Sequence, residues 1–298
     1  MNILITGGTG FVGGYLCTYL EERGDRLMLL TRNPDKYTDT ETRTHHRIDS
    51  KLVPLIDEAD AVINLAGENL FDQRWTSEVK KRIRTSRIEI TSALVKAISE
   101  SEKPPEVMVS ASGINYYKPR GDDEIDENSP PGDDFLAQVC VDWEEAAQEV
   151  EQYGVRLVIP RIGVVLQKED GALAKMVTAF NLFAGGPLGE GSQFFPWIHM
   201  EDLCRSIMYA VNQDKLKGPY NAVSPNPVRM KTFARELGKV MGRPSFFKAP
   251  EFMLKLALGE SAEVITASIN AKPSALLKAD FTFNYPFVDA ALNDILNN

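Results

Sequence analysis

Cysteine and histidine are scarce in this 298-residue sequence, and neither forms a recognisable binding pattern. The three cysteines, Cys17, Cys140 and Cys204, are widely spaced, and none belongs to a Cys-x-x-Cys pair. This argues against a disulfide framework and a zinc site, and we expect three small buried apolar residues. His45 and His46 lie in the polar stretch TDTETRTHHR, which we interpret as a surface loop, so no metal is expected.

The sequence also lacks a long apolar run and an excess of positive charge. No run of 18 apolar residues occurs, and the first residues, MNILITGGTG, are typical of a buried strand rather than of a targeting segment. We therefore expect a cytoplasmic protein without a membrane partner. The 33 Lys and Arg against 42 Asp and Glu give a formal net charge of −9, which repels a phosphate backbone. Nucleic acid is not an expected partner.

What remains is the composition of an ordinary globular protein, with short apolar strands that alternate with helices along the first 166 residues. We predict strands at 2–6, 26–32, 59–67, 105–112 and 155–166. The intervening helices are predicted at 11–23, 76–101 and 134–153, two of them ended by Gly24 and Gly154. Five strands in this alternation predict an α/β fold with a Rossmann-type, doubly wound parallel sheet.

The character of the chain changes after Leu166, where glycine and aromatic residues become frequent. Residues 199–222 again predict a helix followed by a strand. We therefore assign residues 1–166, with about 199–222, to the Rossmann domain. Residues 167–198 and 223–298 are predicted to form a smaller substrate or lid domain.

A glycine-rich loop, GGTGFVG, lies between the first strand and the first helix. Glycines at G-x-x-G-x-x-G spacing permit a tight turn, close approach of backbone N–H groups to a pyrophosphate, and close packing of helix against strand. The position of the loop favours dinucleotide binding over a purely structural turn. The expected cofactor contacts are Gly7, Thr9, Gly10, Phe11, Val12 and Gly13.

Two further strand ends suggest which dinucleotide binds. Thr31 and Arg32 end the second strand, where a site that prefers NAD would carry an acidic residue for the ribose 2′-hydroxyl. An arginine suits a 2′-phosphate, so we predict NADP(H); the alternative is that Arg32 only begins a solvated loop. At the end of the third strand, the small residues would let the adenosine side of the cofactor pass, or would form an ordinary strand end. These residues are Leu65, Ala66 and Gly67.

The order GGTGFVG, NLAG, VSAS, PRIGVVL and WIHMEDL resembles the extended short-chain dehydrogenase/reductase superfamily, which includes nucleotide-sugar epimerases and dehydratases. The segments RWTSEVKKRIRTSRIEIT, GGPLGEGSQFFPWIH and LGESAEVI are similar to an "epimerase family protein" subgroup whose substrate is generally unassigned. The resemblance implies an NAD(P)-binding domain, a small C-terminal substrate domain, and catalysis by Ser or Thr with a Tyr-x-x-x-Lys pair.

The sequence departs from that catalytic pattern. With Glu144 at the superfamily's glutamate, Leu136 takes the place of the tyrosine and Cys140 that of the lysine, and neither can perform the same chemistry. Ser112 retains the serine position at the end of the fourth strand, and Tyr116 and Tyr117 follow it. One of these tyrosines could supply the acidic hydroxyl, with positive charge from Arg87 or Lys80; the alternative is packing or substrate stacking.

Two more cofactor contacts are predicted from the resemblance. Arg87 lies on the helix after NLAG, where it could bind the pyrophosphate or the nicotinamide ribose, or could pair on the surface with Glu78 or Glu89. Val165 falls where the superfamily's backbone passes the nicotinamide, and is otherwise a core valine.

The segment before residue 200 combines aromatic and hydrogen-bonding side chains that would line a substrate pocket or pack at a domain junction. For His199 we expect a local hydrogen bond that fixes the turn into the following helix. The residues concerned are Gln193, Phe194, Trp197 and His199.

Two functions are compatible with these features. The first is an NADP-binding oxidoreductase or epimerase-like enzyme that acts on a small polar or sugar-like substrate. The second is a catalytically silent NADP-binding redox sensor or protein-interaction module, since the Tyr-Lys pair is missing. Helix faces in the superfamily often form dimers, and by that analogy alone the chain could form a homodimer.

Overall fold

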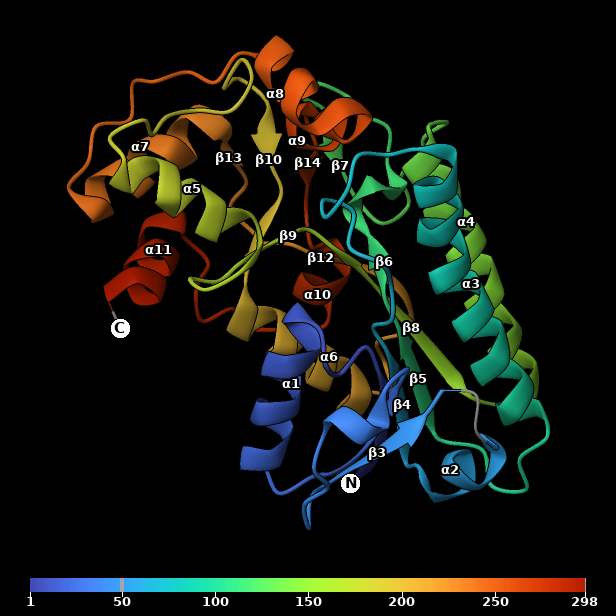
Figure 1. Ribbon diagram of the computed structural model, residues 1–298. Helices are drawn as coiled ribbons and strands as arrows, with labels where there is room; N and C mark the ends of the chain where they lie inside the picture. The colour runs from blue at the N-terminus through green and yellow to red at the C-terminus, as the bar shows by residue number, and fades with distance from the viewer. Residues whose placement is uncertain (49–50, 298) are drawn as a thin grey trace.

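The first strand, β1 (Asn2–Thr6), is buried on both of its faces, and this determines the layers around it. Ile3 and Ile5 face one side and Leu4 the other, and all three are fully buried. A strand of this kind needs helices on both faces of its sheet. The computed structural model, which describes residues 1–48 and 51–297, has this arrangement (Figure 1).

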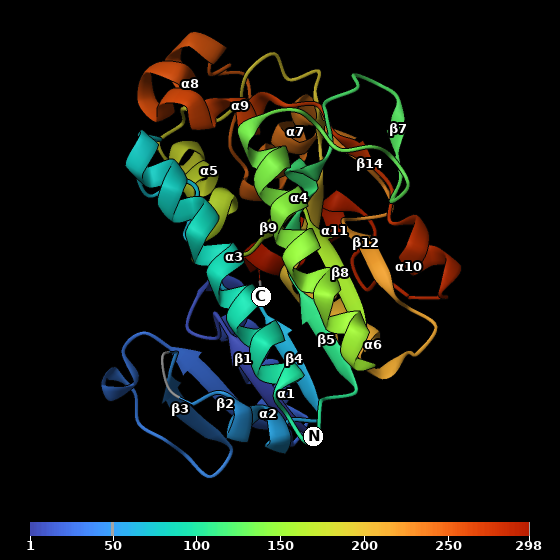
Figure 2. The same cartoon turned by 90° about the vertical axis from the view of Figure 1, so that its right-hand side faces the viewer.

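Two pairs of helices cover the sheet. α1 (Phe11–Glu22) and α6 (Met200–Asn212) pack on the face that carries Ile3 and Ile5. α3 (Ser77–Ser99) and α4 (Phe135–Gln148) cover the opposite face, where they lie side by side (Figure 2). The predicted Rossmann-type α/β fold is therefore confirmed.

The main path of the sheet is parallel throughout, in the order β12-β8-β5-β4-β1-β2-β3. The two-residue strand β6 (Ser112–Gly113) pairs with β8 off this path. The other strands are β2 (Arg26–Thr31), β3 (Arg43–Arg47), β4 (Ala61–Asn64), β5 (Val107–Ser110), β8 (Arg156–Ile162) and β12 (Gly218–Ala222). The chain runs from β1 outward to β3, then returns to β4 on the other side of β1. Such a reversal opens a ligand crevice at the carboxyl ends of β1 and β4.

The polar stretch around His45 and His46 is an edge strand, so its interpretation as a loop was wrong. Both residues lie in β3, parallel to β2, and the short helix α2 (Val53–Glu58) follows. Tyr37 stacks on His45 with ring centroids 5.0 Å apart, and Thr44 hydrogen-bonds His46 at 2.9 Å. Because an edge strand is only partly covered, it tolerates a polar sequence that hides the strand signal.

The predicted strand 155–166 is also interrupted. β8 ends at Ile162, and β9 (Val164–Leu166) pairs instead with β11 (Trp197–His199). The N–H of Gly163 still donates to Ala222 of β12, whereas the N–H of Val164 donates to the carbonyl of Pro196 at 2.6 Å. A Cβ at residue 163 would lie 2.3 Å from that carbonyl oxygen, so only glycine permits the change of partner.

Most of the chain after β9 forms a second layered unit above the sheet in Figure 1. Its core packs Phe180 of α5 against Phe233 and Leu237 of α7 and Leu292 of α11. Two short ladders, β10 with β13 and β7 with β14, complete it. The elements are β7 (Glu124–Ile125), α5 (Gly171–Asn181), β10 (Phe194–Phe195), β13 (Val228–Arg229), α7 (Met230–Met241), α8 (Glu251–Leu258), α9 (Ala262–Thr266), β14 (Asn270–Ala271) and α11 (Val288–Asn297).

One part of the carboxyl-terminal segment returns to the Rossmann core. Leu276 of α10 (Ser274–Lys278) and Phe281 belong to the same apolar cluster as α1 and α6. The assignment of residues 223–298 as one lid domain stays a prediction. Among the helices in the described parts of the chain, none combines the length and apolar character needed to cross a membrane.

The close approach at Gly163 can be tested by adding a methyl group. We expect Gly163→Ala to destabilise the protein by about 1–3 kcal/mol, because the new Cβ overlaps the Pro196 carbonyl. Gly14→Ala is the matched control: its Cβ would have nothing within 4 Å, and alanine favours the helix by about 0.5–1 kcal/mol. Thermal unfolding should give a lower melting temperature for Gly163→Ala and an unchanged or higher one for Gly14→Ala. Equal melting temperatures would contradict the role of Gly163.

Candidate functional site

The glycine loop is closed against the end of β4 so tightly that two positions accept only glycine. Gly7 has φ +70°, and a Cβ there would lie 2.6 Å from the carbonyl oxygen of Leu65. A Cβ at Gly13 would lie 2.1 Å from the carbonyl oxygen of Gly7. Helix α1 then begins at Phe11; its N-cap, Gly10, offers no side-chain cap, and its first turn has no acidic residue. Its first N–H groups are therefore available to an anion at the crevice.

The neighbouring strand end is held by buried polar groups. Thr6 donates to Asn64 at 2.6 Å, and the same hydroxyl accepts the N–H of Ala66 at 3.2 Å. Asn64 donates in turn to Thr91 at 2.8 Å and to Ser110 at 3.2 Å. These bonds tie the ends of β1, β4 and β5 together, so the predicted contact segment Leu65–Gly67 has a fixed position beside the glycine loop.

Arg87 lies against this segment and makes neither of the surface ion pairs considered from the sequence. Its guanidinium donates to the carbonyls of Ile83 at 2.8 Å and Glu68 at 3.1 Å. It also lies 5.2 Å from the centre of the Trp143 ring, and burial lowers its pKa. A Cβ at Gly67 would lie only 2.9 Å from the guanidinium carbon. Pairing with Glu78 or Glu89 was thus the wrong alternative, and the cofactor contact stays a prediction.

The far end of the crevice carries two guanidinium groups. Arg32 is exposed at the end of β2. Arg47 lies opposite Thr31 in the next strand, donates to the carbonyl of Arg32 at 3.4 Å and pairs with Asp35 at 3.0 Å. Sequence reasoning missed Arg47 because its strand was expected to be a loop. The sequence signal for this strand was the short run RTHHR, whose threonine is weak evidence for an edge strand.

Ser112 belongs to a buried ion-pair network. Its hydroxyl donates to Glu144 at 2.7 Å. Arg161 donates to both carboxylate oxygens of Glu144, at 2.9 and 2.7 Å, and the residues are 3% and 5% exposed, respectively. A bidentate pair of this kind has fixed geometry. The glutamate that aligns with the superfamily pattern therefore positions the serine.

The two tyrosines have different environments. The Tyr117 hydroxyl accepts from Arg161 at 2.7 Å and donates to Asn221 at 2.8 Å. It is 1% exposed, and burial raises its pKa well above the ordinary value, so its placement gives no support to a role as a proton donor. Tyr116 is half-buried with its ring centre 3.5 Å from the Arg161 guanidinium carbon. Among the described residues, no hydrogen-bond partner of its hydroxyl is found, and its catalytic role stays a prediction.

The structure also places the residues at the two lost catalytic positions. Leu136 is buried, and Cys140 lies with its sulfur 3.8 Å from the carbonyl oxygen of Gly113. Burial raises the pKa of Cys140 to about 11, so the thiol is neutral near pH 7. Lys80 was considered as a source of charge for the tyrosines, but it pairs with Glu260 at 2.6 Å. As expected, all three cysteines are buried.

Other predicted residues are distributed between crevice and core. Val165 is 8% exposed and belongs to the core cluster. A Cβ at nearby Gly171 would lie 3.1 Å from the ring of Phe11, so the segment from Val165 to Gly171 adjoins the glycine loop. His199 accepts the N–H of Glu201 at 3.2 Å, which confirms the expected turn. In the segment before residue 200, Gln193 lines a cavity and Trp197 is buried in the core of the second unit.

Comparisons with known proteins agree with this geometry. The model of the NAD dependent epimerase/dehydratase family matches residues 3–223. The chain belongs to this family. A second model, for a domain of unknown function, matches residues 249–295. The family assignment confirms the resemblance found in the sequence.

Three relatives show how far the likeness extends. The epimerase family protein SDR39U1 homolog of Arabidopsis thaliana, described as chloroplastic, is 40% identical over 99% of this chain and 87% of its own. The crystal structure of human epimerase family protein SDR39U1 with NADPH has a TM-score of 0.91 and 34% identity, and both chains are covered completely. A nucleoside-diphosphate sugar epimerase of Corynebacterium glutamicum has a TM-score of 0.80 and 31% identity, with 99% of this chain and 58% of that chain covered.

The buried ion pair makes a specific prediction about stability. In Glu144→Gln the Arg161 guanidinium stays buried without a counterion, which should cost about 3–5 kcal/mol. Glu145→Gln changes an exposed neighbour on the same helix and should alter stability by no more than about 0.5 kcal/mol. Thermal unfolding of the two variants provides the comparison. If both melt like the unmodified protein, the pair does not hold the site together.

Proposed function

We propose that this protein is an NADP-dependent oxidoreductase or epimerase-like enzyme that acts on a small polar substrate. The observation that carries the proposal is an uncapped helix N-terminus behind an obligatory glycine loop, with Arg32 and Arg47 at the far end of the same crevice. It is supported by the NADPH in the human family member's structure. We further expect a cytoplasmic location and a small-molecule partner; a homodimer stays an expectation by analogy.

We expect three parts of the crevice to bind three different parts of the cofactor. The first-turn N–H groups of α1 would bind the pyrophosphate, and Arg32, with Arg47 beside it, would bind the 2′-phosphate. Leu65, Ala66 and Gly67 would adjoin the adenosine and ribose, with Arg87 behind Gly67. A bound nicotinamide supplies hydride transfer, and Val165 lies on the segment that we expect to pass beside it.

Proton transfer would depend on hydroxyl groups, because the family's lysine position carries the neutral Cys140. Ser112 is fixed by Glu144, and its oxygen retains lone pairs that can accept from a substrate hydroxyl. Tyr116 follows Ser112 closely in the chain and is the tyrosine whose hydroxyl is not engaged among the described residues. We therefore place Ser112 in substrate orientation and Tyr116 in proton transfer.

A catalytically silent NADP-binding module is the second candidate. It is favoured by the engagement of Tyr117 with Arg161 and Asn221 and by the neutral side chains at positions 136 and 140. Both candidates require the same cofactor crevice. They differ only in whether a substrate is turned over.

Cofactor choice can be tested by calorimetric titration of nucleotide-free protein with NADPH, NADP, NADH and NAD. Arg32→Ala should weaken NADPH binding by about 10-fold or more, because the charge-assisted hydrogen bonds of the guanidinium to the 2′-phosphate are lost. NADH has no 2′-phosphate, so its binding should be nearly unchanged. Arg47→Ala should act in the same direction. Arg26→Ala, exposed at the opposite end of β2, is the matched control. Equal losses for NADPH and NADH would refute the 2′-phosphate role.

Catalysis can be separated from silent binding with a panel of carbonyl compounds and nucleotide sugars, followed by NADPH absorbance and product isomers. For any substrate that is turned over, Ser112→Ala should lower the rate by about 100-fold while NADPH binding persists. Ser99→Ala, an exposed serine at the end of α3, should leave the rate unchanged. Tight NADPH binding without any turnover would favour the silent module instead.

A further inference from the structure

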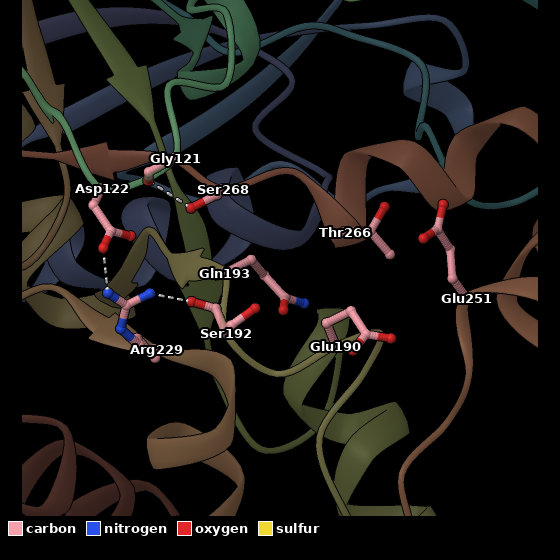
Figure 3. Close-up of a pocket in the computed structure, with 9 residues that line it drawn as sticks. All are labelled: Gly121, Asp122, Glu190, Ser192, Gln193, Arg229, Glu251, Thr266 and Ser268. Carbon is pink, nitrogen blue, oxygen red and sulfur yellow. Dashed lines mark hydrogen bonds and ion pairs between the residues drawn. The ribbon is translucent and has the colours of Figure 1, made fainter.

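A polar cavity of about 360 Å³ lies in the second unit, between β13, the loops before β7 and β10, and the segment of α8 and α9 (Figure 3). Among the described residues, its lining has three carboxylates, one arginine and four hydroxyl or amide side chains. The loop that carries Gly121 and Asp122 continues from Tyr116 and Tyr117, so one wall of the cavity is connected to the carboxyl edge of the sheet. Its volume is within the range of small-molecule sites.

The hydrogen-bond donors around the cavity are largely committed to the protein. Arg229 donates to Asp122 at 2.8 Å and to the carbonyl of Ser192, as the dashed lines in Figure 3 show. Its charge is thus directed to the wall rather than into the space. A guanidinium in this state offers little to an incoming phosphate.

Three other lining side chains also donate to protein groups. The Ser268 hydroxyl donates to a backbone carbonyl at 2.9 Å, the Gln193 amide nitrogen to another at 2.8 Å, and the Thr266 hydroxyl to a third at 3.3 Å. The accepting carbonyls belong to Gly121, Leu188 and Ala262. The Thr266 hydroxyl oxygen and the Gln193 amide oxygen retain acceptor capacity, whereas the Ser268 oxygen already accepts the N–H of Phe194 at 3.1 Å and keeps one lone pair.

Gln193 supplies independent evidence that a ligand belongs here. It is 7% exposed, and its amide oxygen is buried without a hydrogen-bond partner. Figure 3 shows the amide group between Ser192 and Glu190. A buried acceptor without a donor is costly, and a turn of the amide toward a ligand that donates a hydrogen bond would relieve the cost.

The charges in the wall balance one another. Asp122 pairs with Arg229, Glu190 pairs with Lys248 at 2.8 Å, and Glu251 pairs with Lys255 at 3.0 Å. A diphosphate would approach three carboxylates with no uncommitted arginine to receive it. A polyamine would have to displace cations that already neutralise those carboxylates. Acceptor groups in a balanced electrostatic setting favour an uncharged ligand that carries many donors.

We propose that this cavity recognises an uncharged, hydroxyl-rich small molecule such as a monosaccharide or cyclic polyol, without a nucleotide attached. The inference rests on the proposed function, because it assigns the substrate class of that enzyme. The ligand's hydroxyl groups donate to Gln193, to the carboxylates and to the lone pairs of Thr266 and Ser268. Recognition therefore comes from acceptors in the second unit, and redox chemistry from the crevice of the sheet.

Saturation-transfer NMR tests this with D-glucose, D-galactose and myo-inositol as probes, and with UDP and spermidine as charged comparators. We expect transfer to at least one neutral probe and none to UDP or spermidine. Thr266→Val removes a cavity hydroxyl and should weaken binding by about five-fold or more. Thr178→Val is the matched control, since Thr178 likewise donates to the carbonyl four residues earlier in a helix, at 3.0 Å, but does not line the cavity.

A second variant covers the case in which Thr266→Val does not fold. Gln193→Met keeps the length of the side chain and removes both amide atoms, and it should also weaken binding of the neutral probe. If the unmodified protein binds UDP or spermidine and either variant loses that binding, the proposed ligand class is overturned. Absence of transfer to all three neutral probes would overturn it as well.

NADPH titration of the same preparations separates the two hypotheses. Protein that binds NADPH but no neutral probe contradicts the cavity inference and leaves the proposed cofactor function intact. Protein that binds a neutral probe in a Thr266-dependent way but no NADPH supports the recognition site and contradicts the proposed enzyme.

Discussion

The buried ion pair between Glu144 and Arg161 connects elements that are far apart in the sequence. Glu144 belongs to α4 and Arg161 to β8, and the pair also holds Ser112 of β6. Through Tyr117 and Asn221 it reaches β12, the last strand of the sheet. Burial of two charges is costly, and the full bidentate geometry is what makes this pair tolerable. At the carboxyl edge of the sheet, the pair consequently fixes the orientation of Ser112 and the position of α4.

The parts of the fold that could be predicted are those encoded by local sequence. β1 and α1 follow from a short apolar run, a glycine loop and a helical apolar stripe, all within 22 residues. The edge strand β3 could not be predicted, because its pairing depends on β2 rather than on its own apolar content. The interruption at Gly163 was equally hidden, since the contact that breaks the strand comes from Pro196, 33 positions later.

The candidate site divides in the same way. The glycine spacing identifies Gly7 and Gly13, because the constraint on them is local close packing. The environments of Arg87 and Tyr117 could not be predicted: one faces backbone carbonyls and Trp143, and the other bonds to Asn221, which is 104 residues away. A polar side chain shows its type in the sequence, but its partner, and with it its availability for chemistry, is decided by the fold.

The loss of the superfamily's lysine can be understood from the same ion pair. A lysine at position 140 would place another cation in a buried region where both oxygens of Glu144 are already engaged by Arg161. A neutral thiol needs no counterion, and burial holds the pKa of Cys140 at about 11. The positive charge at this edge thus belongs to Arg161, which faces Tyr116 and Tyr117 instead of a tyrosine on α4. In the enzyme that we propose, proton transfer would begin from a hydroxyl on the segment after β6, so the proposed acid would differ from that of the superfamily in its position in the chain.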